Sequence, residues 1–286
     1  MVGLVMLPAV TVPMMRWKND AMPLTLLILV AVIQGLTEFL PVSSSGHLAL
    51  IPMITDHPYQ GRAIDVAAHV GTLGAVMWYL RTDLLAMLRA MLPGGDVGQR
   101  RLIASLIIAT IPVIIIGFVV NAADPAWLTS PMTLAISNLV FAGLLWQADR
   151  VGALTRRLAD MRIGTALMIG LVQCAALIPG ASRSGVTMMA ARYLGFDRLA
   201  AARFSLLLSI PAIAGAGLLK GLEIAAAGDT QLGLDAGVVM VLSFVFALLA
   251  IGWMMRLLAR TNFTIFVWYR LVLGGVLLAA IMTGLI

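Results

Sequence analysis

Two short polar segments interrupt the apolar runs of this 286-residue chain, and they hold the residue types that could do chemistry. Segment 34–47 reads Gln-Gly-Leu-Thr-Glu-Phe-Leu-Pro-Val-Ser-Ser-Ser-Gly-His, and segment 179–187 reads Pro-Gly-Ala-Ser-Arg-Ser-Gly-Val-Thr. Ionisable and hydroxyl side chains are costly at membrane depth, so they usually mark a functional site there. A carboxylate, a histidine, serines and an arginine, with glycines and prolines that break helices, suit the handling of a phosphate group.

The first segment combines a nucleophile, a base and a carboxylate. Glu38 is the only acid in the interior of an apolar run, and Gln34 lies one helical turn before it on the same face. Ser44 and His47 supply a hydroxyl and a group that titrates near neutrality. Glu38 could bind Mg²⁺ or Ca²⁺ through oxygen, orient His47, or only pair with Arg183, and these alternatives stay open.

The second segment adds positive charge. In both segments a proline stops one helix and a serine can cap the next, so free N–H groups of the new helix point at the turn. Arg183 contributes a guanidinium whose planar fork matches phosphate oxygens. Two helix N-termini and one arginine would form a diphosphate cradle. A simpler alternative is that the serines and glycines only cap and pack helices.

Composition indicates an integral membrane protein. Hydrophobic residues make up 61% of the chain, charged residues 11%, and the mean hydropathy is +1.02. Apolar runs such as 102–120 and 199–219 are long enough to cross a bilayer. We therefore expect one membrane domain over 22–286. Residues 1–21 would be an N-terminal extension, untranslated or disordered, since Met1, Met15 and Met22 are all candidate starts.

The net charge of +6 does not indicate nucleic-acid binding, because the basic residues lie in short loops, where they set membrane topology. Cys174 is the only cysteine, which excludes an intrachain disulfide or a cysteine metal site. The oligomeric state stays open, a homodimer included.

An offset of 139 residues relates the two halves of the chain, so that 34–147 map onto 173–286. Each half begins with an apolar segment broken in its middle, 24–54 or 164–195, which predicts a re-entrant helix–loop–helix hairpin. Three spans then follow in each half, at about 64–80, 102–120 and 132–146, and at 200–219, 236–255 and 265–286. Because three is odd, the halves should be inverted relative to each other. The fold expected is an all-α polytopic inverted repeat with six transmembrane helices and two re-entrant hairpins.

The basic residues predict the orientation. The side that holds the N-terminus carries four of them, Arg16, Lys18, Arg62 and Lys220. The other side carries thirteen, namely Arg81, Arg89, Arg100, Arg101, Arg150, Arg156, Arg157, Arg162, Arg192, Arg198, Arg203, Arg256 and Arg260. The positive-inside rule makes the second side cytoplasmic and places both termini outside. The count leaves out Arg183 and Arg270, which lie in or near apolar runs.

The two polar segments resemble the signature motifs of bacterial undecaprenyl-diphosphate phosphatases of the bacitracin-resistance type. The resemblance covers nearly the whole chain from about residue 22. It implies hydrolysis of a C55 isoprenoid diphosphate to the monophosphate that carries cell-wall precursors. It also implies a divalent-cation requirement, an outward-opening cavity, and a location in the bacterial inner membrane.

Carried over by position, the resemblance implies a role for each polar residue. Ser44 would be the attacking serine, and His47 its base or proton shuttle. Glu38, with Gln34, would form the metal or activating pair, although many members have glutamate at the position of Gln34. The residues implied to bind the diphosphate are Arg183, Ser43, Ser45, Ser182, Ser184 and Thr187.

A secondary transporter or flippase for a lipid phosphate is the alternative function, because inverted repeats with broken helices are typical of transporters. The Ser-Ser-Gly-His sequence favours the enzyme, since transport does not need it. Among other polar residues, we expect His69 to be a packing histidine and His57 to be inert. Asn138 and Gln147 would be interhelical hydrogen-bond partners.

Overall fold

The computed structural model describes residues 22–55, 57, 59–227 and 230–285, so the expected extension 1–21 lies outside the described residues. The described part is helical, and it contains an isolated bridge between Arg156 and Phe196 but no strand. The α-helices are α1 (Leu24–Thr37), α2 (Ser44–Ile54), α3 (Arg62–Tyr79), α4 (Arg81–Ala90), α5 (Val97–Ala123), α6 (Pro131–Val151), α7 (Ile163–Gln173), α8 (Arg183–Tyr193), α9 (Arg198–Ala227), α10 (Thr230–Leu258) and α11 (Thr264–Met282). Short 3₁₀ helices are η1 (Ala126–Thr129), η2 (Leu158–Asp160) and η3 (Cys174–Leu177).

Five described helices are long and apolar enough to cross a membrane, namely α5, α6, α9, α10 and α11. A sixth span results if α3 and α4 count as one, with a bend of 73° between them. Helix α3 carries Asp65 in its first turn and His69 one turn later, and these polar residues make α3 alone a weaker candidate. Helices α5, α6, α9 and α10 extend beyond the predicted spans, whereas α11 ends at Met282, before the predicted end at 286. The order agrees with the prediction, and so does the number when α3 and α4 count as one span.

Large apolar side chains are exposed along the spans. On α5, for example, the exposed side chains are Ile107, Ile111, Ile114, Ile115, Ile116, Phe118 and Val119. Such a continuous apolar surface is unfavourable in water and matches the acyl chains of a bilayer. The protein is therefore a multi-pass, all-α membrane protein, as the composition predicts.

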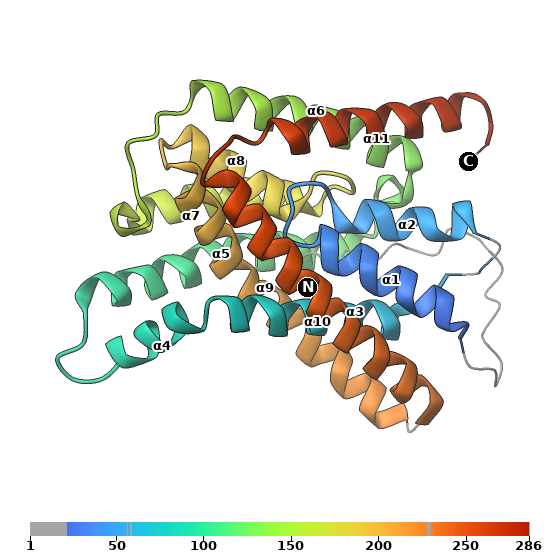
Figure 1. The fold of residues 1–286 in the computed structure, drawn as a ribbon, viewed down its shortest axis with the longest axis horizontal. Coiled ribbons are helices and arrows are strands. Elements are labelled where there is room, and N and C mark those ends of the chain that lie inside the picture. Colours follow the sequence, from blue (N-terminus) through green and yellow to red (C-terminus); the bar gives the residue numbers. More distant parts are fainter. Residues whose placement is uncertain (1–21, 56, 58, 228–229, 286) are drawn as a thin grey trace.

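Two helical hairpins approach each other from opposite ends of the molecule (Figure 1). The pair α1–α2, in blue, is broken at 38–43, and the pair α7–α8 is broken at 178–182. Their turns are in contact, because the Ser184 hydroxyl donates a hydrogen bond of 2.8 Å to the carbonyl of Leu40. Both broken segments thus form the hairpins expected from the sequence, and their tips meet.

Each hairpin packs on a span of the other half, as expected of two duplicated halves. An offset of 139 residues relates α1 to α7, α3 to α9, α5 to α10 and α6 to α11. Helix α1 packs on α10 and α7 packs on α5, while α3 packs on α9 and α6 on α11. The last two helices run in opposite directions along the upper edge of Figure 1. The repeat boundaries at 34–147 and 173–286 stay a prediction.

A glycine lies at the crossing of each hairpin with its partner helix. A Cβ added to Gly35 would lie 2.6 Å from Cβ of Phe246 on α10, and one added to Gly170 would lie 2.4 Å from the carbonyl oxygen of Ala109 on α5. Both distances are too short for an unstrained contact, so each crossing requires the small residue. These close crossings fix the hairpins against the spans.

The arginine-rich loops gather at one end of the helical bundle. Asp149 accepts hydrogen bonds from Arg192 Nε at 3.1 Å, Arg198 Nε at 2.8 Å and the backbone N–H of Phe263 at 3.1 Å. At the same end, Arg203 of α9 pairs with Asp83 of α4. The structure therefore brings together the loops that the charge count assigns to one side of the membrane.

Candidate active site

The two hairpin turns have the same capped backbone. Ser43 and Ser182 have φ values of 73° and 70°, which side-chain-bearing residues rarely adopt. Each hydroxyl oxygen accepts from the backbone N–H three residues later, of Gly46 at 3.4 Å or Gly185 at 3.2 Å. The two serines are 139 residues apart, so the sequence offset relates local structure as well as residue type. Both serines are the N-caps that we predicted.

One buried arginine connects the two turns. The Arg270 guanidinium donates to the carbonyls of Gly180 at 2.9 Å, Ala181 at 3.0 Å and Pro41 at 3.5 Å. Its Nε donates to Asn138 Oδ1 at 2.9 Å, and Arg270 is fully buried. Asn138 is thus the interhelical partner that we expected. We predicted no role for Arg270 from the sequence, although a charge in an apolar run usually signals one.

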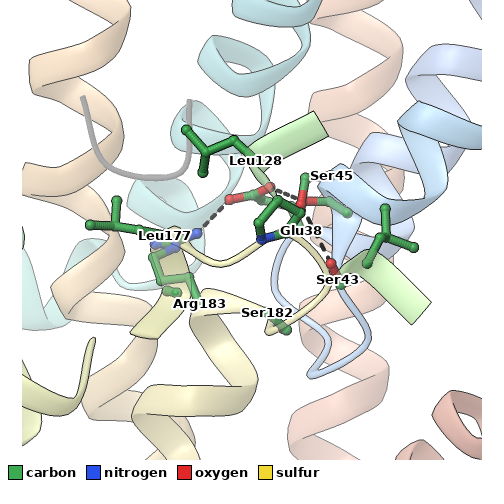
Figure 2. Close-up of a pocket in the computed structure, with 11 residues that line it drawn as sticks. Glu38, Ser43, Ser45, Leu128, Leu177, Ser182 and Arg183 are labelled. Atoms are coloured by element: carbon green, nitrogen blue, oxygen red, sulfur yellow. Dashed lines mark hydrogen bonds and ion pairs between the residues drawn. The ribbon is translucent and has the colours of Figure 1, made fainter. Parts of the chain in front are cut away.

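The Glu38 carboxylate interacts with residues of both turns. Its Oε1 pairs with Arg183, and its Oε2 accepts from Gln34 Nε2 at 2.8 Å and from Ser44 Oγ at 2.7 Å. Figure 2 shows Arg183 reaching from its turn to Glu38 on the opposite one. The carboxylate and the guanidinium are both buried, at 6% and 8% exposure of the side chain. The two polar segments therefore form one site, as predicted.

A histidine from outside the two polar segments lies at this carboxylate. His69 Nε2, on α3, is 3.5 Å from Glu38 Oε2, and its Nδ1 is 2.7 Å from the carbonyl oxygen of Asp65. The expectation that His69 only packs is wrong, because the inward face of α3 passes directly beside the end of α1. An ionisable residue within a span was the signal that could have found it.

The ring nitrogens of His47 contact groups other than the Ser44 hydroxyl. Its Nδ1 is 2.7 Å from the carbonyl oxygen of Ser43, its Nε2 pairs with the hydroxyl of Tyr269, and the two rings stack with centroids 5.5 Å apart. Both ring nitrogens are thus engaged, and Ser44 donates to Glu38 instead. Tyr269 was not among the predicted site residues, and it lies 222 residues from His47 along the chain.

The pocket at the meeting point has a polar wall and an apolar one. Its polar lining consists of Glu38, Ser43, Ser44, Ser45, Ser182 and Arg183. Its apolar lining consists of Leu128, Leu134, Ala176, Leu177 and Pro179. Of the other predicted site residues, Gln34 supports Glu38, and Ser184 and Thr187 bond to Leu40 and Ser205 within the packed helices.

The donor set does not by itself form a cation site. Among the described residues, no group of three or more His, Cys, Asp or Glu side chains could hold a metal ion. Glu38 is a single carboxylate, and both of its oxygens already accept from donors, one of them the cationic Arg183. Mg²⁺ and Ca²⁺ need several oxygen ligands. The protein side chains alone therefore do not fit either ion.

Comparisons with known proteins agree with this geometry. The family model described as bacitracin resistance protein BacA matches residues 27–276. The undecaprenyl-diphosphatase of Ruegeria pomeroyi is 47% identical over 88% of this chain and 96% of its own length. Those of Roseobacter denitrificans and Desulforudis audaxviator are 46% and 42% identical, over 88% and 90% of this chain and 96% and 98% of their own. The chain belongs to the bacitracin resistance protein BacA family.

Proposed function

We propose that this protein hydrolyses undecaprenyl diphosphate to undecaprenyl phosphate and inorganic phosphate. One observation carries the proposal: Ser44 and Arg183, which begin equivalent helices in the two hairpins, both contact Glu38 in one pocket. The names of the relatives support this substrate. The reaction would return the lipid carrier to cell-wall synthesis. No observation favours the transporter or flippase alternative.

The diphosphate would bind where the two turns meet. Arg183 would leave its ion pair with Glu38 and donate to phosphate oxygens instead. These oxygens carry more charge and accept two parallel hydrogen bonds from the guanidinium. The first N–H groups of α2 and α8 would add donors and favourable helix dipoles. The apolar wall of Leu128, Leu134 and Leu177 would contact the first isoprene units of the lipid.

The contact between Ser44 and Glu38 supports a covalent route. Ser44 Oγ would attack the terminal phosphorus in line with the bridging oxygen, and Glu38 Oε2 would accept the hydroxyl proton. The bridging P–O bond would break, and undecaprenyl phosphate would leave with that bond's electron pair. Water would then hydrolyse the phosphoserine, release inorganic phosphate and restore the hydroxyl. Arg183 would stabilise the charge on the transferred phosphoryl group.

His47 receives a different role here from the one that the family resemblance implies. Because its Nδ1 contacts the Ser43 carbonyl, His47 would hold the turn that presents Ser44. We assign acceptance of the Ser44 proton to Glu38, whose oxygen lies 2.7 Å from that hydroxyl.

A cation requirement remains a proposal from the family resemblance, and no step above depends on one. Comparing phosphate release with and without a chelator, after re-addition of Mg²⁺ or Ca²⁺, tests it directly. Activity that a chelator abolishes and either ion restores would support the requirement. Activity that survives the chelator would contradict it.

We also propose that the protein lies in the bacterial cytoplasmic membrane with its arginine-rich end in the cytoplasm and both termini outside. The clustering of Asp149 with Arg192 and Arg198, and of Arg203 with Asp83, supports a common side for these loops. A reporter fused after the C-terminus should therefore lie on the outer side of the membrane and show its activity there. Activity on the cytoplasmic side would overturn the orientation.

Phosphate release by the purified protein in detergent tests the proposed activity. With undecaprenyl diphosphate, one inorganic phosphate should appear for each undecaprenyl phosphate formed. Translocation of the lipid across vesicle membranes without phosphate release would contradict the phosphatase and establish transport.

A further inference from the structure

Four polar groups surround the Glu38 carboxylate, and the mechanism above assigns no role to His69, which is one of them. Arg183 pairs with Oε1, while Gln34 and Ser44 donate to Oε2. His69 is the fourth group, with its Nε2 3.5 Å from the same Oε2 that accepts from Ser44. A side chain beside Oε2, the oxygen proposed to accept the Ser44 proton, can control the orientation of the carboxylate.

Hydrogen-bond chemistry determines which His69 nitrogen donates. Nδ1 lies 2.7 Å from the backbone carbonyl of Asp65, and a carbonyl oxygen only accepts, so Nδ1 carries a hydrogen. Nε2 then faces a carboxylate oxygen, and a bare lone pair there would repel it. A neutral imidazole has only one N–H, so Nε2 can also donate toward Glu38 only in the imidazolium, which carries a hydrogen on both nitrogens. In that form the contact with the carboxylate is attractive.

The surroundings of His69 make this contact specific. His69 is 9% exposed, and helices α1, α9 and α10 all pack against α3. The charged groups around it are Glu38 and Arg183 at the turns and Asp65 on its own helix, which is itself bonded to Tyr59 and Gln60. Segments 24–37, 204–215 and 236–255 of the packed helices carry no charged residue.

We propose that His69 is a positioning residue for the reaction, which donates from Nε2 to Glu38 and holds Oε2 toward the Ser44 hydroxyl. Gln34 approaches Oε2 from α1 and His69 from α3, so the carboxylate is held from two helices. The 3.5 Å separation is long for a hydrogen bond, and such contacts commonly shorten when the substrate binds. This inference rests on the proposed function, in which Glu38 accepts the proton of Ser44.

Two variants of similar size separate donation from packing. His69→Gln keeps an N–H that can reach Glu38, whereas His69→Met has a similar length and no donor. We expect His69→Met to lower kcat for phosphate release by about tenfold or more with KM within about threefold, as a hydrogen bond to a charged group implies. His69→Gln should stay within about threefold of the wild-type kcat.

Thr72→Val serves as the control, because Thr72 is buried one turn further along α3 and its hydroxyl bonds only within its own helix, to the His69 carbonyl at 2.9 Å. It should leave kcat and KM unchanged. If His69→Met does not fold, His69→Asn replaces it. The asparagine side chain is one methylene shorter than glutamine, so its amide does not reach Glu38.

The outcomes separate this inference from the proposed function. Equal kcat values in the glutamine and methionine variants, whether both normal or both reduced, would overturn the positioning role. An effect confined to KM would also overturn it. If the wild-type protein released no phosphate at all, the proposed function would fail first.

Discussion

The two hairpin turns share a backbone and differ in the residue at their centre. Ser43-Ser44-Ser45-Gly46 and Ser182-Arg183-Ser184-Gly185 both begin with a capping serine of positive φ and continue into a helix. Where the first turn has a hydroxyl, at Ser44, the second has a guanidinium, at Arg183. Equivalent turns therefore bring a hydroxyl, the proposed nucleophile, and a guanidinium to the same pocket.

The helices that lead into the turns differ in the same sense. Glu38 corresponds through the offset to Leu177, and Gln34 corresponds to Gln173. Gln34 donates to Glu38, whereas Gln173 is fully buried and neither its Oε1 nor its Nε2 has a hydrogen-bond partner among the described residues. In the proposed mechanism, this difference corresponds to a first hairpin that supplies the reacting groups and a second that binds the diphosphate.

Removal of the nucleophile should have the largest effect. Ser44→Ala should lower kcat by about 10⁴-fold, since loss of an attacking serine leaves only binding and charge stabilisation. Substrate labelled on its terminal phosphate should leave label on the wild-type protein and none on the variant.

Ser209→Ala is the matched control, because Ser209 is buried in α9 and bonds only to the carbonyl of Leu206, at 2.6 Å. It should keep both activity and label. Labelling of Ser44→Ala, or no labelling of the wild type during turnover, would contradict the covalent route.

Removal of the cation should have the next largest effect. Arg183→Ala should lower kcat/KM by about 10³-fold, as expected for an arginine that stabilises a transferred phosphoryl group. Arg203→Ala breaks a partly exposed pair with Asp83 at the end of the bundle and should change kcat/KM by less than about twofold. Phosphate release at several substrate concentrations measures both, and retained activity in Arg183→Ala would refute the cradle.

The two glutamines should give the smallest and most instructive difference. Gln34→Leu removes a donor to a buried carboxylate and should lower kcat/KM by about tenfold. Gln173→Leu removes a buried amide without a partner and should stabilise the fold by about 1 kcal/mol, with unchanged activity.

Thermal unfolding in detergent, beside the phosphatase assay, distinguishes the two glutamine variants. If they behaved alike in both measurements, the contrast between the hairpins would be wrong.

Much of this arrangement could be predicted from sequence, because it is local or periodic. Apolar length predicted the spans, prolines and serines predicted the turns and caps, and helical spacing predicted the contact of Gln34 with Glu38. The convergence of the turns followed from the 139-residue offset together with the three spans in each half, because an odd number of spans inverts the second half. These features depend on residues close in the chain or on symmetry.

The contacts that could not be predicted join residues distant in the chain. His69 lies on α3, and its distance from Glu38 depends on how α3 packs against α1. The pairing of His47 with Tyr269, and the bonds of Arg270 to both turns, depend on the placement of α11. His69 and Arg270 are recognisable in the sequence as ionisable residues in or near apolar runs, but the sequence does not indicate their partners.

A double-mutant cycle across the two hairpins tests most directly whether they form one catalytic unit. Glu38→Gln, Arg183→Lys and the combined variant are compared with the wild type by kcat/KM for phosphate release. Residues that act as a unit are strongly non-additive, so we predict that the combined variant stays within about threefold of the slower single variant. A fall equal to the product of the two single effects would show independent action and contradict the single site.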